Sequence, residues 1–62
     1  MDWNQFKKID PYLLVGLVNT ELRNHAESLN DFCSTHDIDQ MQLCARLETV
    51  NYQYNKEHNQ FR

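Results

Sequence analysis

The Asp10-Pro11 pair marks the start of the longest regular element in this 62-residue chain. Asp is favoured at an N-cap because its carboxylate accepts a hydrogen bond from a backbone N–H, and Pro suits the first helical position, where its missing N–H has no partner. Beyond the pair, apolar side chains recur along one helical face at Leu14, Leu17, Val18, Leu22 and Ala26. The sequence therefore predicts a helix of about four turns. Gly16 lies inside it at a cost of ~0.5–1 kcal/mol relative to Ala, so we expect another segment to pack close to it.

Two further N-cap patterns predict two more helices. Ser28 with Asp31 three residues later precedes a short segment with an apolar face at Leu29, Phe32 and Cys33. Asp39 with Gln42 three residues later forms a capping box, and the buried stripe that follows is Leu43, Leu47 and Val50. The turn between these two helices is centred on His36-Asp37-Ile38.

The spacing of the apolar residues changes after Val50, from a helical period to alternation. Tyr52 and Tyr54 alternate with polar residues, and a polar segment precedes Phe61. Alternation with aromatic residues around an Asn-rich turn predicts a hairpin, which must lie on the helices because an isolated hairpin is barely stable.

The predicted fold is a mostly-α, small three-helix domain of helix-turn-helix-like order with a C-terminal β-hairpin. The chain is too short for two cores, so we expect a single domain over residues 1–62. Its parts are an N-terminal arm at 1–9, docked through Trp3 and Phe6, a helical core at 10–50 and the hairpin at 51–62.

A known family has similar short motifs in the same order. They are Asp10-Pro11-x-Leu13-Leu14, Val18-Asn19-x-x-Leu22-Arg23, Ser28-Leu29, Asp37-Ile38-Asp39, Tyr52-x-Tyr54-Asn55 and Asn59-Gln60-Phe61. The run resembles the short bacterial proteins grouped as domain of unknown function 4250. The resemblance implies a free-standing bacterial cytoplasmic protein of this length, and it supplies no catalytic residues. It directs attention to Asn19, Arg23 and the Asn59-Gln60-Phe61 run.

The charge and the apolar runs exclude several classes of protein. Six Lys and Arg against nine Asp and Glu give a net charge of −3, which argues against a generally basic nucleic-acid binder. The longest apolar run, Leu13–Val18, is far shorter than the ~20 residues of a membrane span. The polar, acidic start Met1–Gln5 does not resemble a signal peptide. We therefore expect a cytoplasmic protein with no membrane partner.

The helix-turn-helix order keeps a DNA-binding regulator open as the alternative function. Gln40, Gln42 and Arg46 on the third helix and Lys56 in the hairpin turn would be the DNA contacts, since Gln can read adenine and Arg can read guanine. The remaining Lys and Arg residues are scattered through the chain, whereas DNA affinity depends on phosphate neutralisation. A helical packing unit without DNA binding is the favoured interpretation.

Metal and catalytic chemistry have weak sequence support. Cys33-x-x-His36 has a zinc-like spacing that Cys44, His25 or His58 could complete, but a structural zinc site needs a second ligand pair. Both cysteines lie on apolar faces, where we expect free thiols. So short a chain also has little volume for a substrate pocket of ~300–1,000 Å³. We expect no metal, no cofactor and no enzymatic activity.

Seven large aromatic rings in this chain exceed what a small core needs. We expect Trp3, Tyr12 or Tyr54 to be exposed, which would suit a protein–protein surface, where Tyr and Trp are enriched. The predicted function is a non-enzymatic interaction module that binds an unidentified protein, with a homodimer as one form of that binding.

Overall fold

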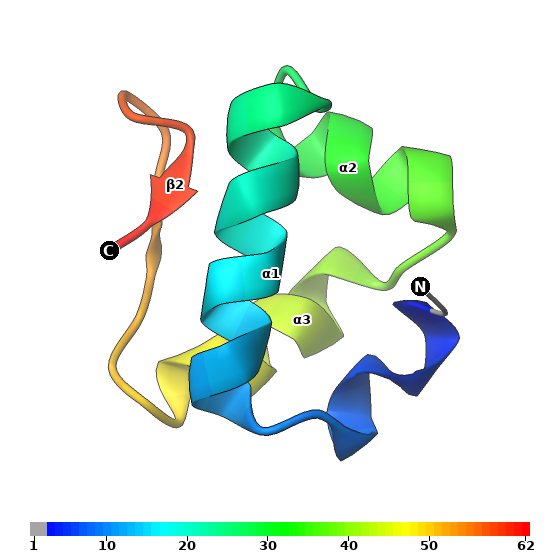
Figure 1. Ribbon diagram of the computed structural model, residues 1–62, viewed down its shortest axis with the longest axis vertical. Helices are drawn as coiled ribbons and strands as arrows, with labels where there is room; N and C mark the ends of the chain where they lie inside the picture. The colour runs from blue at the N-terminus through cyan, green and yellow to red at the C-terminus, as the bar shows by residue number, and fades with distance from the viewer. Residues whose placement is uncertain (1–2) are drawn as a thin grey trace.

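The computed structural model describes residues 3–62 and has the predicted mostly-α fold closed by a hairpin. Its elements are the 3-10 helix η1 (Trp3–Lys8), the helices α1 (Pro11–Asn24), α2 (Leu29–His36) and α3 (Gln40–Glu48), and the strands β1 (Tyr54–Asn55) and β2 (Gln60–Phe61). In Figure 1, α1 runs through the middle of the molecule, with the hairpin on one side and α2 and η1 on the other. The first two residues of the predicted arm lie outside the described part of the chain.

The three α-helices begin at the predicted N-caps. The cap oxygen accepts hydrogen bonds from first-turn N–H groups in each case: Asp10 from Tyr12 (3.3 Å), Ser28 from Asp31 (3.0 Å), and Asp39 from Met41 (3.0 Å) and Gln42 (3.2 Å). Since these bonds join residues two or three apart, they fix the helix starts locally. Asp37, in the left-handed conformation (φ 55°), ends α2 and turns the chain into α3.

The core receives apolar side chains from η1, the three α-helices, the α2–α3 turn and β2. These are Trp3, Phe6, Leu14, Val15, Val18, Leu22, Leu29, Phe32, Cys33, Ile38, Leu43, Leu47 and Phe61. Docking of the arm through Trp3 and Phe6 is thus confirmed, whereas the expected exposure of Trp3 is wrong. Only 6% of Trp3 is exposed, because its ring packs edge-on against Phe32 of α2 with centroids 5.0 Å apart.

Gly16 differs from its prediction. No atom of another segment lies within 4 Å of the position that a Cβ would take, and the residue is exposed. The face of α1 that carries Gly16 is therefore open at this residue within the described fold.

The C-terminal hairpin is confirmed, with strands of two residues each. Tyr54 pairs with Phe61 and Asn55 with Gln60, antiparallel. Phe61 is 2% exposed and packs against the helical core, so the hairpin covers one side of α1, as Figure 1 shows. Within residues 3–62, no helix has the length and apolar character needed to cross a membrane.

Candidate functional site

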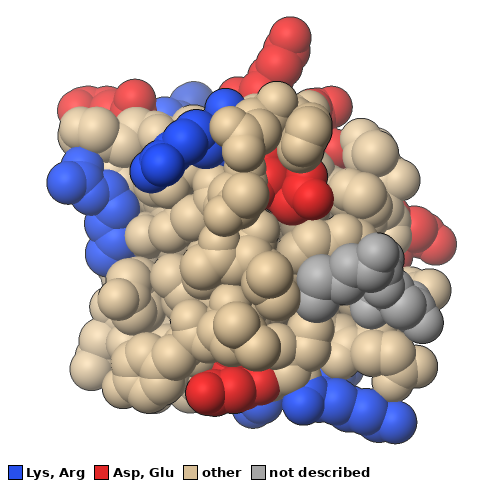
Figure 2. Space-filling view, viewed as in Figure 1, with Lys and Arg blue, Asp and Glu red and all other residues tan. Residues whose placement is uncertain are grey.

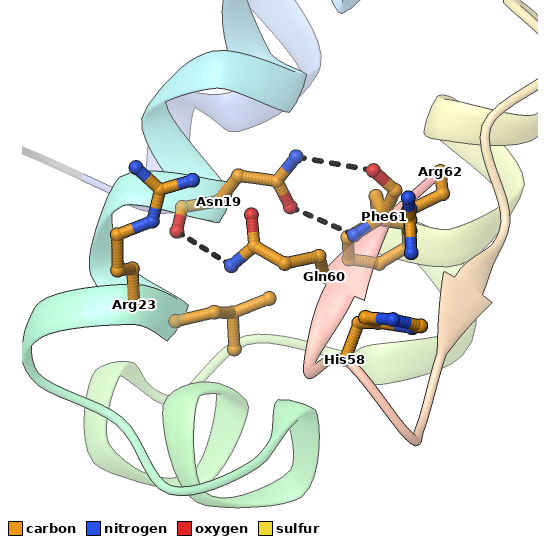
Figure 3. A pocket seen from close by; sticks show the side chains of 7 residues that line it. Asn19, Arg23, His58, Gln60, Phe61 and Arg62 are labelled. Atoms are coloured by element: carbon orange, nitrogen blue, oxygen red, sulfur yellow. Dashed lines mark hydrogen bonds between the residues drawn. The ribbon is translucent and has the colours of Figure 1, made fainter.

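A pocket of about 600 Å³ lies between the C-terminal half of α1 and the hairpin (Figure 3). It is lined by Asn19, Leu22, Arg23, His58, Gln60, Phe61 and Arg62, and we refer to it as the hairpin pocket. The sequence predicted little volume for a pocket of ~300–1,000 Å³, and this hollow at the surface lies within that range. Polar side chains bridge much of the contact between the hairpin and α1, and this leaves a hollow beside the bridges.

The first bridge joins Asn19 of α1 to the backbone of Phe61. Asn19 Oδ1 accepts a hydrogen bond from Phe61 N–H at 2.7 Å, and Asn19 Nδ2 donates to Phe61 O at 3.1 Å. The side-chain amide therefore pairs with β2 as a neighbouring strand would. Gln60 Nε2 adds a bond to Asn19 O at 3.0 Å.

The second bridge is centred on Asn59, which adopts a left-handed conformation (φ 51°). Its Nδ2 donates to Leu22 O at 2.9 Å and to Ala26 O at 3.1 Å, two carbonyls at the end of α1. Its Oδ1 accepts from the Tyr54 hydroxyl at 2.6 Å, and that hydroxyl accepts from Leu29 N–H at 3.2 Å. Asn59 thus ties the hairpin to the end of α1 and, through Tyr54, to the start of α2.

Arg23, His58 and Arg62 line the pocket without taking part in these bridges. Arg23 and Arg62 are exposed, and across residues 3–62 neither guanidinium makes an ion pair or a hydrogen bond. The His58 ring is oriented by Asn55, whose Oδ1 lies 3.2 Å from His58 Nδ1. None of the lining side chains carries a carboxylate, a thiol or a hydroxyl group.

A second surface is formed by Tyr12, Leu13 and Gly16 of α1, and we refer to it as the Tyr12 surface. Tyr12 is 66% exposed and Leu13 is 58% exposed. Of the three rings predicted for an interaction surface, Tyr12 alone is largely exposed. Trp3 is buried, and Tyr54 is half-buried with its hydroxyl engaged by Asn59.

The four predicted DNA contacts differ in their exposure to solvent. Gln40, Gln42 and Lys56 are exposed, but Arg46 is half-buried. Its Nη2 donates to Ile9 O at 3.1 Å, so the guanidinium is used inside the fold, and its buried Nε has no hydrogen-bond partner among residues 3–62.

The cysteines are free thiols in protected surroundings. Burial raises the pKa of Cys33 to about 11, with smaller contributions from nearby Cys44 and Asp39. Burial also raises the pKa of Cys44. His36 of the zinc-like pair packs against Phe32, with ring centroids 5.0 Å apart. Over residues 3–62, no three His, Cys, Asp or Glu side chains are grouped so as to hold a metal ion.

Sequence reasoning identified part of the hairpin pocket. The family resemblance pointed to Asn19, Arg23 and the 59–61 run, and all but Asn59 line the pocket. It missed His58 and Arg62, because only the register of the hairpin places them opposite α1. Tyr54 as the partner of Asn59 was also missed.

Comparison with known proteins gives one family and no individual relative. The family model described as Domain of unknown function (DUF4250) matches residues 8–61, which include the described helices α1 to α3 and both strands. No curated protein and no solved structure matches the chain.

Proposed function

The chain belongs to the DUF4250 family, and from the surface it presents we propose that it is a non-enzymatic module that binds another protein through the Tyr12 surface. One observation carries the proposal. Two large side chains, Tyr12 and Leu13, stand exposed at adjacent positions of the longest helix, one turn from a glycine with open space around it.

Isolated exposed apolar residues are normal on a protein surface. The difference here is Gly16, which costs about 0.5–1 kcal/mol in a helix interior and has no close neighbour in the fold to require it. A missing side chain lets the backbone of a partner approach α1 closely, and Tyr12 beside it offers the kind of ring that is enriched in interfaces. A protein partner on this face gives all three residues a role.

The chemistry of the chain supports a role without catalysis. The lining side chains of the hairpin pocket include no hydroxyl, thiol or carboxylate group, and His58 has no such group beside it in that lining. The Cys33 thiol is buried and its pKa is raised to about 11, so it is protonated near neutral pH and is a poor nucleophile.

The test compares a surface variant with a matched control. Tyr12→Gln combined with Leu13→Gln removes the apolar groups and keeps good helix formers, while Met41→Gln removes an apolar side chain that is 83% exposed on α3. Sedimentation over a concentration series measures self-association of each chain. Chemical crosslinking of each tagged chain in a cell lysate, followed by mass spectrometry, identifies other partners.

We expect a complex, with a second copy or with one defined protein, that the double variant loses and Met41→Gln retains. If the wild-type chain, the double variant and Met41→Gln form the complex equally well, the interface lies outside the Tyr12 surface. A chain that stays monomeric and crosslinks to no defined protein would overturn the proposal.

A further inference from the structure

The hairpin pocket concentrates positive charge in an acidic protein. The whole chain has a net charge of −3, yet two of its six Lys and Arg residues line this pocket, and no Asp or Glu does. Arg23 comes from the last turn of α1, and Arg62 follows β2. In the face that Figure 2 shows, Lys and Arg side chains lie near one another at the upper left, on the side of the hairpin, and acidic side chains lie beside them at the same corner.

The fold itself does not use these two guanidinium groups. Within residues 3–62 they have no hydrogen-bond or ion-pair partner, whereas the guanidinium of Arg46 donates to Ile9 O. A cation in the last turn of a helix is favoured by the helix dipole, which gives Arg23 a structural reason. The helix dipole gives no such structural reason for Arg62, because Arg62 is on the hairpin. Both side chains line one pocket only because β2 is held against α1.

The bridges make the floor of the pocket rigid. The amide of Asn19 is fixed by two bonds to the backbone of Phe61, and Gln60 Nε2 is fixed by bonds to two carbonyls. The hairpin pocket is therefore shaped before any ligand arrives, which lowers the entropy that binding costs. Figure 3 shows Arg23 and Arg62 on opposite sides of this Asn19–Gln60 floor.

These features select a class of ligand. Guanidinium groups bind the oxygens of carboxylates and phosphates through paired N–H donors. Two cations on opposite sides suit an anion whose oxygens point in several directions, which favours tetrahedral phosphate over a flat carboxylate. The volume of about 600 Å³ exceeds that of a single phosphate ion and leaves room for a larger phosphate compound. We propose that the hairpin pocket binds a small phosphate compound with at least two negative charges between Arg23 and Arg62.

The test is an NMR titration of the full chain with sodium pyrophosphate at low ionic strength, because exposed ion pairs are screened by salt. We expect saturable shifts at the side-chain amides of Asn19 and Gln60 and at the two arginines. Arg23→Gln and Arg62→Gln should each weaken binding about tenfold or more, since each removes charged hydrogen bonds. Lys8→Gln is the matched control, because it removes one exposed positive charge on η1, away from the hairpin in Figure 1.

Further measurements would support or overturn phosphate binding in the hairpin pocket. Thermal melts of Arg62→Gln should match the wild-type chain closely, and those of Arg23→Gln should fall only slightly through the lost interaction with the end of α1, since neither guanidinium has a partner among residues 3–62. Absence of a saturable shift at about 10 mM pyrophosphate would overturn it, because affinity weaker than this is non-specific. So would equal binding by the Arg23→Gln, Arg62→Gln double variant. A parallel titration with citrate tests whether the pocket prefers phosphates to carboxylates. Citrate that binds as tightly as pyrophosphate would contradict this preference.

Discussion

Replacement of Asn59 tests whether polar bridges hold the hairpin on the helices. Asn59→Ala removes three hydrogen bonds, two to the carbonyls of Leu22 and Ala26 and one from the Tyr54 hydroxyl. At about 1 kcal/mol each these bonds contribute ~3 kcal/mol. Ala also costs about 1 kcal/mol in the left-handed conformation that Asn59 adopts at φ 51°. The expected loss of about 4 kcal/mol is similar to the ~3–5 kcal/mol that a domain of this size has in total.

Asn59→Ala should therefore be largely unfolded in buffer and should refold in trimethylamine N-oxide, which favours the compact state. Asn59→Gly separates the two contributions, because Gly adopts positive φ readily and loses only the ~3 kcal/mol of hydrogen bonds. Asn51 is the matched control. It also has positive φ (66°), is exposed, and makes no side-chain hydrogen bond within residues 3–62.

Urea denaturation followed by far-UV circular dichroism and by the fluorescence of buried Trp3 gives the free energy of unfolding. Agreement between the two signals shows that the whole domain unfolds together. We expect Asn51→Gly to change stability little and Asn51→Ala to cost about 1 kcal/mol. If Asn59→Gly costs no more than Asn51→Gly, the bridges contribute nothing, and the reasoning is refuted.

Three further substitutions test separate features of the fold. Gly16→Ala should raise the free energy of unfolding by about 0.5–1 kcal/mol because open space surrounds the site, and it should weaken any complex formed through the Tyr12 surface; a lower melting temperature would contradict this. Burial raises the pKa of Cys33 from 9.0 to about 11, so between these values the unfolded chain loses the proton first and stability falls as pH rises. Urea midpoints across this range should fall more steeply for the wild-type chain than for Cys33→Ala, and equal slopes would refute the assignment. Arg46→Ala should cost about 1–2 kcal/mol, because Ile9 O loses its donor and the buried stem of Arg46 is removed; an unchanged urea midpoint would show that this contact is dispensable.

The helices could be predicted from the sequence because their signals are local. Asp10, Ser28 and Asp39 accept hydrogen bonds from residues two or three positions later, so a short window contains both partners. The hairpin could be predicted from the change of period after Val50. The prediction that Trp3 is exposed was wrong, because the number of aromatic residues does not indicate which rings lie in the core. Trp3 packs there against Phe32.

The hairpin pocket could not be derived in this way, because its contacts join distant residues. Asn19 and Phe61 are 42 positions apart, and nothing in the local pattern distinguishes Asn19 from the other polar residues of α1. Arg62 could not be placed next to Arg23 without the register of the two strands. The family resemblance compensated in part by marking Asn19, Arg23 and the 59–61 run, although it did not say what they do.

The structure divides those marked residues into two groups. Asn19, Asn59, Gln60 and Phe61 are accounted for by stability, since each is bonded across the contact between the hairpin and α1. Arg23 has no such bond, although it lies one turn from Asn19 and lines the same pocket. A favourable interaction with the end of α1 would be satisfied by Lys as well as by Arg, because it depends on charge alone. A paired-donor contact to an oxyanion requires the planar guanidinium, so the identity of this side chain separates a merely structural arginine from one that binds a ligand.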